Sequence, residues 1–340
     1  MTMKKTSLVL LICASLFSCK QKKSVPEVSG IEVNVTIERF DRAFFSIDTS
    51  DIQAGLRKLQ QQFPAFYPDF MEQLLGVSGS DTSRNTLEVT GFFLRNYRVI
   101  YDSLQVRYKD TGWLKKELEQ GYRFVKYYFP RYKPGRAILF VGPLDAPGVA
   151  NTTAGLAIGL QQFGGKDFFA YQSAEIQEMF PAYITRRFSP EYLTANCMKA
   201  VVEDMFPDQS GGKSLVDQMI EKGKLWYLLD KFMPLTPDSV KTGYTQHQLD
   251  WCKEYEGQIW SYIIKNEDLH SLTPLVIQTY IGEAPFTQGL SQEDSPGNIG
   301  QWVGWQIIKK FVAKNPGLTP EEVMKTDSKK ILEEAKYKPK

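Results

Sequence analysis

Residues 200–215, AVVEDMFPDQSGGKSL, contain two patterns that resemble chemical sites. The GGKS run, residues 211–214, has the ending of a loop that surrounds phosphate groups with backbone N–H groups and a lysine. The run VEDMF, residues 202–206, has the length of the zinc-protease pattern HExxH and keeps its glutamate, but both histidine positions are apolar. The two chemistries need different neighbouring residues, and those neighbours decide whether either is feasible.

The phosphate-binding pattern fails at its first position. The full pattern G-x-x-x-x-G-K-[ST] requires a glycine where this chain has Pro207, which has no N–H to donate and a fixed φ angle. Such a loop also follows a buried strand, whereas residues 190–206 have helical spacing. We therefore expect no nucleotide here, but a Gly-Gly turn before a helix that Ser214 caps and that has Asp217 in its first turn.

The zinc pattern fails at both of its ligands. In HExxH the two histidines bind the metal from one helical turn, and the glutamate activates a water molecule. On a helix over residues 190–206 these offsets fall on Val202, Glu203 and Phe206, and valine and phenylalanine have no lone pair to donate. The chain's two histidines are too far apart to replace them. Glu203 is then either solvated or partly buried and paired, and we expect neither a metal nor another cofactor.

The N-terminus has the features of a bacterial lipoprotein signal. Lys4 and Lys5 precede the apolar run LVLLICASLF, which is too short to span a bilayer. Residues 16–19, LFSC, fit the lipobox, so cleavage would leave Cys19 as the mature N-terminus with a diacylglyceryl group on its thiol. Two or three acyl chains anchor a protein stably, whereas one does so marginally. The alternative is an ordinary signal peptide with an incidental cysteine.

These features define the expected organisation of the chain. Residues 1–18 are a signal peptide, residues 19–30 are a polar tether, and residues 31–340 form a single domain, because no later segment is long or polar enough to be a linker. Removing residues 1–18 takes away two lysines and no acidic residue, so the formal net charge falls from +2 to zero. This charge does not indicate a nucleic-acid partner, whereas the lysines after Cys19 favour an anionic membrane surface.

Two cysteines remain for the folded part of the chain, Cys197 and Cys252. An oxidising periplasm would allow them to form a disulfide. They are otherwise two buried thiols that pack as small apolar side chains.

Hydrophobic periodicity predicts an α+β fold that is mainly helical, with a small sheet early in the chain. Residues 31–40, IEVNVTIERF, alternate as a half-buried strand does, and residues 136–142, RAILFVG, are typical of a buried strand. Two short strands are expected around Gly155, and we expect the sheet to be antiparallel. Helical spacing is present over residues 51–76, 83–108, 111–129, 173–180, 190–206, 213–232, 245–265, 273–280 and 298–314.

Two later segments carry a resemblance to a known family. They are MIEKGKLWYLLDKFMP, residues 219–234, and SPGNIGQWVGWQIIKKFV, residues 295–312. Together with the lipobox, they resemble the gliding-motility lipoprotein family GldB, over nearly the whole mature chain. The resemblance implies a lipid-anchored protein of the cell membrane or outer membrane, exposed to the periplasm. It also implies a role in gliding motility, and in the associated secretion machinery, beside other envelope proteins.

That family is similar in layout to a group of predicted zinc metallopeptidases, which have HExxH on one helix and a glutamate-glycine pair on the next. Here the pair falls on Lys222 and Gly223, with Glu221 one position early. The resemblance implies a degenerate peptidase-like scaffold without catalysis, in a structural or assembly role. Two alternatives remain: an envelope hydrolase that uses Glu203 and Glu221, and a lipoprotein that binds a peptide or ligand in the remnant cleft.

A protein that works by contact needs exposed anchors, and aromatic residues are the usual ones. Trp302 and Trp305 are three positions apart on one expected helix, flanked by Gly300 and Gly304, which would let another backbone approach closely. We consider them candidates for a contact surface. The alternative is core packing, because the apolar stripe from Ile299 to Phe311 is adjacent.

The anchor can be tested directly. Replacing Cys19→Ala removes the thiol that carries the lipid, so the protein is expected to move from the membrane fraction to the soluble fraction. Fractionation followed by immunoblotting measures this, with Cys13→Ala as the matched control. Continued membrane retention of the Cys19 variant would exclude lipidation as the anchor.

Overall fold

The computed structural model describes residues 25–79, 83–266 and 269–340. Its elements in chain order are β1 (Ile37–Arg39), α1 (Phe40–Phe45), α2 (Ile52–Gln62), the π-helix η1 (Asp69–Leu74), α3 (Arg84–Asn96), α4 (Arg98–Tyr108), α5 (Gly112–Tyr128), β2 (Ala137–Phe140), β3 (Val149–Thr152), β4 (Gly155–Gly159), the 3₁₀ helices η2 (Leu160–Gln162) and η3 (Phe169–Tyr171), α6 (Ala174–Met179), α7 (Ala182–Thr185), α8 (Pro190–Met205), α9 (Leu215–Phe232), α10 (Asp238–Thr242), α11 (Gln246–Glu254), α12 (Glu256–Asn266), α13 (Pro274–Ile281), α14 (Ile299–Lys314), α15 (Pro320–Lys325) and α16 (Ser328–Ala335).

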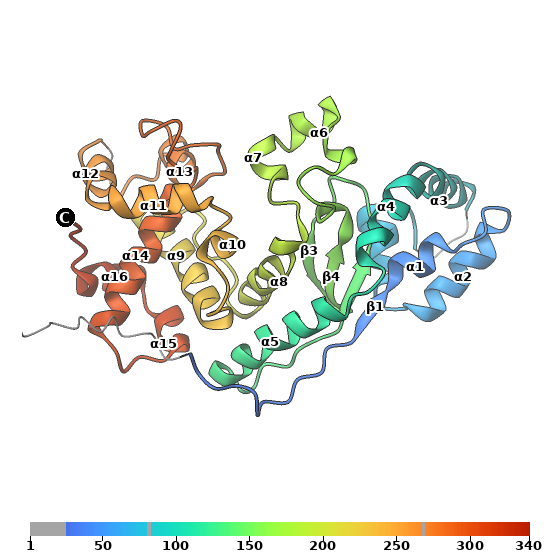
Figure 1. Ribbon diagram of the computed structural model, residues 1–340, viewed down its shortest axis with the longest axis horizontal. Coiled ribbons are helices and arrows are strands. Elements are labelled where there is room, and N and C mark those ends of the chain that lie inside the picture. The colour runs from blue at the N-terminus through green and yellow to red at the C-terminus, as the bar shows by residue number, and fades with distance from the viewer. Residues whose placement is uncertain (1–24, 80–82, 267–268) are drawn as a thin grey trace, which may run out of the picture.

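The helices form two groups on either side of a small sheet (Figure 1). Helices α1–α4 lie on one side of the sheet, and α8 packs against β3 on the other. The C-terminal helices lie beyond α8, and α5 runs along the sheet and the C-terminal group. Buried apolar side chains from Val35 to Tyr337 form one continuous cluster, so both groups share a core.

The sheet is mixed, and the expectation of an antiparallel sheet is wrong. Its strand order is β1-β2-β4-β3, in which β1–β2 and β2–β4 are parallel and β3–β4 is antiparallel. The chain returns from β1 to β2 through five α-helices and the π-helix η1, and a long crossover of this kind allows parallel pairing. The turn between β3 and β4 contains two residues, which imposes an antiparallel hairpin. The fold remains α+β and mainly helical, as predicted.

The alternation over residues 31–40 describes an extended segment of which three residues, β1, form the strand. Its odd positions are more buried than its even ones up to Ile37, as the pattern predicts. The backbone before β1 bonds instead to side chains of α5. Glu119 accepts a hydrogen bond from the Val35 N–H at 3.2 Å, and Lys115 donates to the Val35 carbonyl at 2.5 Å. Alternation therefore reports which side chains are buried, not whether the backbone pairs in a sheet.

The longer predicted helices are present, and three of the spans are divided. The span 51–76 contains α2 and η1, separated by a segment that includes Pro64 and Pro68. The span 83–108 is interrupted at Tyr97, between α3 and α4, and the span 245–265 at Tyr255, between α11 and α12. The helices that the sequence did not predict have at most eight residues, too few to show a clear period. They are α1, α7, α10, α15 and α16.

The C-terminal helices are organised by direct backbone contact between α9 and α14. A Cβ atom on Gly304 would lie 1.7 Å from the Met219 carbonyl oxygen of α9, and one on Gly223 would lie 2.3 Å from the carbonyl carbon of Gly304. Glycine is therefore required on both helices. The predicted stripe from Ile299 to Phe311 is buried beside this contact.

Trp302 and Trp305 lie within this core rather than on a contact surface. They are 1% and 2% exposed, so neither is available to a partner. The Trp305 ring packs edge-on against Trp226, with centroids 5.7 Å apart, and its Nε1 donates to Asp230 at 2.9 Å. The contact-surface hypothesis is thus corrected: Gly304 admits the backbone of α9 and Gly300 admits that of α13 at Tyr280, not a partner.

Cys197 and Cys252 are free thiols, and both are buried. Burial raises the pKa of both, which keeps them protonated and unreactive. They pack as apolar side chains, the second of the two alternatives.

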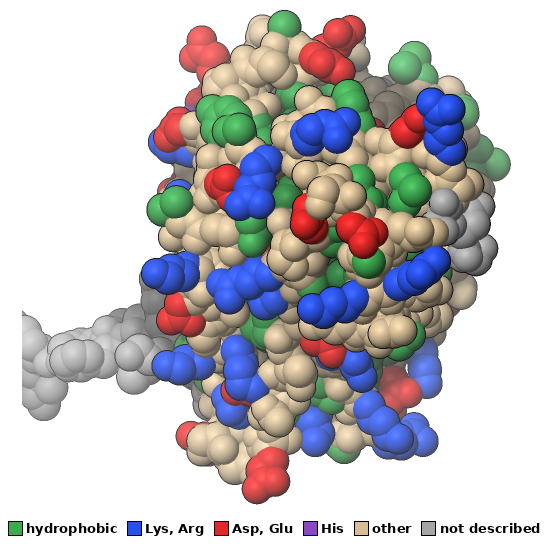
Figure 2. Space-filling view, turned by 90° about the vertical axis from the view of Figure 1, so that its right-hand side faces the viewer, with side chains coloured by type: hydrophobic (Ala, Val, Ile, Leu, Met, Phe, Trp, Pro, Cys, Tyr) green, Lys and Arg blue, Asp and Glu red, His purple; other side chains and the backbone are tan. Residues whose placement is uncertain are grey.

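The molecule's surface carries charges of both signs. On the side where α2 and α3 lie, Lys and Arg side chains are interspersed with Asp and Glu (Figure 2). Among the helices of the described ranges, none has the length and apolar character needed to cross a bilayer. The predicted signal peptide, Cys19 and the first part of the predicted tether fall outside the described residues.

Replacing Gly304→Ala is expected to lower the free energy of unfolding by about 3 kcal/mol or more, because α9 and α14 must separate to admit one methyl group. At an unconstrained helix position the same change is stabilising by up to about 1 kcal/mol. The control is Gly317→Ala, where a Cβ meets nothing within 4 Å. Urea unfolding of both variants measures the difference, and equal stability would contradict the assigned contact.

Candidate functional site

The residues singled out by the sequence lie around one cleft between α8 and α9. The cleft has a volume of about 480 Å³ and is closed on a third side by the segment joining α15 to α16. The sequence candidates that line it are Val202, Glu203, Phe206, Glu221 and Lys222. The resemblance implied that these residues of two consecutive helices lie close together, and in the structure they line the same cleft.

The turn between the helices has the structure predicted from GGKS. Gly212 has a φ of +75°, in the left-handed region that favours glycine. Ser214 is the N-cap of α9 and its Oγ accepts a hydrogen bond from the Asp217 N–H at 3.4 Å. The same hydroxyl donates to the Asp217 carboxylate at 2.6 Å. The segment is therefore a turn followed by a helix cap, and the Ser214 hydroxyl is bonded to Asp217 rather than left for a phosphate.

The HExxH offsets place apolar side chains where ligands would be. Val202 is 1% exposed, and the ring of Phe206 packs edge-on against Phe129 with centroids 5.8 Å apart. Glu203 is exposed, which is the solvated alternative, and it makes no hydrogen bond or ion pair with another described residue. Among residues 25–79, 83–266 and 269–340, no three His, Cys, Asp or Glu side chains are grouped as metal ligands.

Glu221 is held by a buried ammonium group that the sequence analysis did not identify. Lys224 is 3% exposed, and its Nζ donates to both Glu221 oxygens at 3.1 Å and to the Thr326 carbonyl at 2.8 Å. Ser328 donates to the same carboxylate at 2.6 Å. The Glu221 carboxylate thus already has a cation, and the cation is a lysine side chain.

The lysine assigned to the metal-ligand position has a different role. Lys222 forms a surface ion pair with Asp208 at 2.6 Å, across the cleft mouth. Its neighbour Gly223 provides the contact with α14 described above. The two positions that hold glutamate and glycine in the zinc peptidases are therefore Lys222 and Gly223 in this chain. Lys222 forms a surface ion pair, and Gly223 packs against α14.

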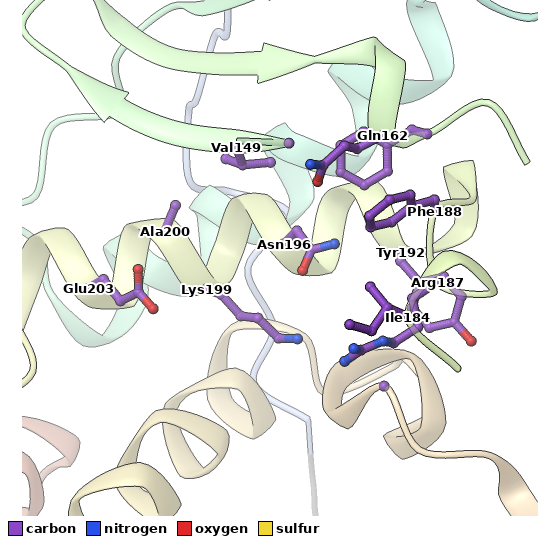
Figure 3. Close-up of a pocket in the computed structure, with 13 residues that line it drawn as sticks. Val149, Gln162, Ile184, Arg187, Phe188, Tyr192, Asn196, Lys199, Ala200 and Glu203 are labelled. Atoms are coloured by element: carbon purple, nitrogen blue, oxygen red, sulfur yellow. The ribbon is translucent and has the colours of Figure 1, made fainter. Parts of the chain in front are cut away.

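A second cavity, of about 290 Å³, lies on the other side of Glu203, along α8 (Figure 3). Lys199 and Arg187 extend toward the same space within it, and Asn196 lies beside them. Burial, and then the nearby Arg187, lower the pKa of Lys199 to about 8. No sequence pattern indicates this cavity, because Arg187 precedes α8 and no motif joins it to Lys199.

The Lys224 cluster makes a stability prediction. Lys224→Met removes the buried cation of the Glu221 carboxylate and leaves only Lys213, whose Nζ lies 3.7 Å away and is more exposed. We expect a loss of about 2 kcal/mol in the free energy of unfolding, below the cost of breaking a fully buried pair because Glu221 is 19% exposed and keeps this second cation. The double variant Lys224→Met, Glu221→Leu should recover part of this loss.

The control is Lys222→Met, which breaks an exposed ion pair and is expected to cost at most about 1 kcal/mol. Thermal and urea unfolding measure all three variants. Equal losses for Lys224→Met and Lys222→Met would show that the buried cluster does not hold the cleft together.

Comparison with known proteins gives one match. The sequence model of the family described as gliding motility protein GldB matches residues 21–339. No curated protein and no solved structure matches, so the peptidase-like scaffold implied by the sequence has no structural support. The family match covers nearly the whole chain and includes the cleft, both cavity-lining helices and the α9–α14 contact. The chain belongs to the gliding motility protein GldB family.

Proposed function

We propose that this protein is a lipid-anchored envelope component of the gliding-motility machinery, and of the secretion associated with it, that acts by contact and not by catalysis. Membership of the GldB family supports the motility role. The lipobox supports the anchor, since the family match begins at residue 21, two positions after Cys19. The folded part would then face the periplasm, where it meets other envelope proteins.

The non-catalytic role is supported chiefly by the occupation of Glu221. Its two oxygens accept hydrogen bonds from Lys224, and one of them also accepts from Ser328. Donors of this chain therefore occupy both carboxylate oxygens, which leaves the group poorly placed to contact a substrate. The apolar Val202 and Phe206 add packing surface to the same cleft and no reactive group.

An envelope hydrolase is the second candidate, and one observation favours it: Glu203 and Glu221 line the same cleft. A pair of carboxylates can divide acid and base roles when their environments differ. Glu203 is solvated and Glu221 is paired with Lys224, so their environments do differ. The same cleft could instead bind a peptide or ligand without cleaving it. That role is non-catalytic and is therefore part of the first proposal.

The variant Glu203→Gln separates the two candidates. It keeps the size of the side chain and removes the acid-base group, so a contact role predicts gliding within about twofold of wild type. Loss of a general acid or base typically lowers a rate by about 10²-fold or more. The measurement is colony spreading and single-cell gliding speed in a gliding strain that lacks its own family member.

Two further strains interpret the result. Cys19→Ala should abolish complementation if the anchor is required, and wild type sets the upper limit. Abundance of each protein is measured by immunoblot. Loss of gliding by a Glu203→Gln protein that is present at normal abundance would overturn the non-catalytic proposal.

A further inference from the structure

The cavity beside α8 is enclosed by parts of the chain that are distant in sequence. Lys199, Asn196 and Tyr192 come from α8, and Arg187 from the segment before it. Val149 of β3 forms part of the opposite wall. At about 290 Å³ the cavity is near the lower limit of small-molecule sites in proteins.

The two cations of the cavity differ in their partners. Arg187 forms a bidentate ion pair with Glu283, with nitrogen–oxygen distances of 2.9 and 3.3 Å. Lys199 makes no hydrogen bond or ion pair with any other residue in the described ranges, although it is half-buried. Glu203, one turn further along α8, is exposed and not within ion-pair distance of it. Lys199 therefore has no direct ion-pair partner, and its acidic neighbours Glu283 and Glu203 act on it only at longer range.

We propose that this cavity binds the carboxylate group of a small ligand, with Lys199 as its principal cation and the Asn196 amide as a further hydrogen-bond donor. Asn196 makes no hydrogen bond with the described part of the chain, so its amide is available. Figure 3 shows both side chains directed into the space that Arg187 closes from the other side.

Charge and shape favour a carboxylate over a phosphate. Because Glu283 is paired with Arg187 and the exposed Glu203 also lines the cavity, at most one positive charge remains, which suits a monoanion better than a phosphate dianion. The remaining walls include the apolar Val149, Ile184 and Phe188, beside the polar Gln162 and Glu203. A ligand with a carboxylate at one end and an apolar body at the other would bury both parts.

The titration of Lys199 gives the site a distinctive pH dependence. Burial and Arg187 lower its pKa to about 8, while Glu283 and Glu203 oppose this shift. A bound carboxylate adds a negative charge and raises the pKa again. Binding near pH 8 therefore takes up protons, and affinity falls as the pH rises above 8, by up to about tenfold per unit.

The same shift predicts the effect of Lys199 on stability. Its folded-state pKa lies below the unfolded value of 10.5, so the unfolded state binds more protons between these two values and stability increases with pH there. Below pH 8 the charged lysine is a cost to the folded state. Removing it should leave stability at pH 7 unchanged or higher, which is the opposite of what removing a structural ion pair does.

The experiment titrates purified full-length protein in detergent with phenylacetate, using isothermal titration calorimetry at pH 7, 8 and 9. Phenylacetamide, which has the same body without the charge, and inorganic phosphate are the comparison probes. We expect saturable binding of phenylacetate alone, proton uptake at pH 8, and weaker binding at pH 9. Lys199→Met should weaken binding roughly tenfold or more, with no loss of thermal stability at pH 7.

The matched control is Lys222→Met, which removes a lysine from the other cleft and should bind phenylacetate as wild type does. Four results would overturn the proposal. They are no saturable binding of phenylacetate, equal affinity for phenylacetamide, tighter binding of phosphate, or unchanged affinity in Lys199→Met. Clear destabilisation by Lys199→Met would assign the lysine to an internal ion pair instead.

Discussion

Two helices whose backbones touch can have no side chain at the point of contact, and α9 and α14 meet in this way at Gly223 and Gly304. This contact fixes the rotation of α9 about its own axis. With Gly223 facing α14, Lys224 lies toward the α15–α16 connection and reaches Thr326, while Lys222 lies at the surface. The walls of the α8–α9 cleft are thus a consequence of helix packing. The glycine that resembles part of a metal-binding motif is required for a different physical reason.

The buried lysines show how the molecule compensates charge away from water. Lys224 has Glu221, and Lys241 has Asp230 and Asp238. Burial alone would lower the pKa of Lys241, but its two acidic neighbours outweigh burial and raise it. Lys199 is the exception among these three, because its pKa is lowered. The two buried lysines thus have close acidic partners, whereas the half-buried Lys199 has none at ion-pair distance, and the proposed carboxylate site depends on this difference.

Features that depend on neighbouring residues were predictable from the sequence, and features that depend on distant ones were not. The Ser214 cap, the buried stripe beginning at Ile299 and the burial pattern before β1 follow from local spacing. Ser328 reaches Glu221 across 107 positions, and Arg187 reaches Glu283 across 96. No periodicity encodes such pairs. The sheet direction was missed for the same reason, since it depends on where β4 inserts between β2 and β3.

The path of the chain into the fold also has a mechanical consequence. Residues 31–35 run along α5, and their backbone is bound at intervals by Lys115, Glu119, Arg123 and Lys126 (Figure 1). The chain then enters β1, which is parallel to β2 in the sheet. A pulling force applied through a membrane anchor at the N-terminus would act on residues 31–35. It would be distributed over the hydrogen bonds that these residues make with α5. Tension applied there would pass into α5 through these side chains and into the sheet through β1.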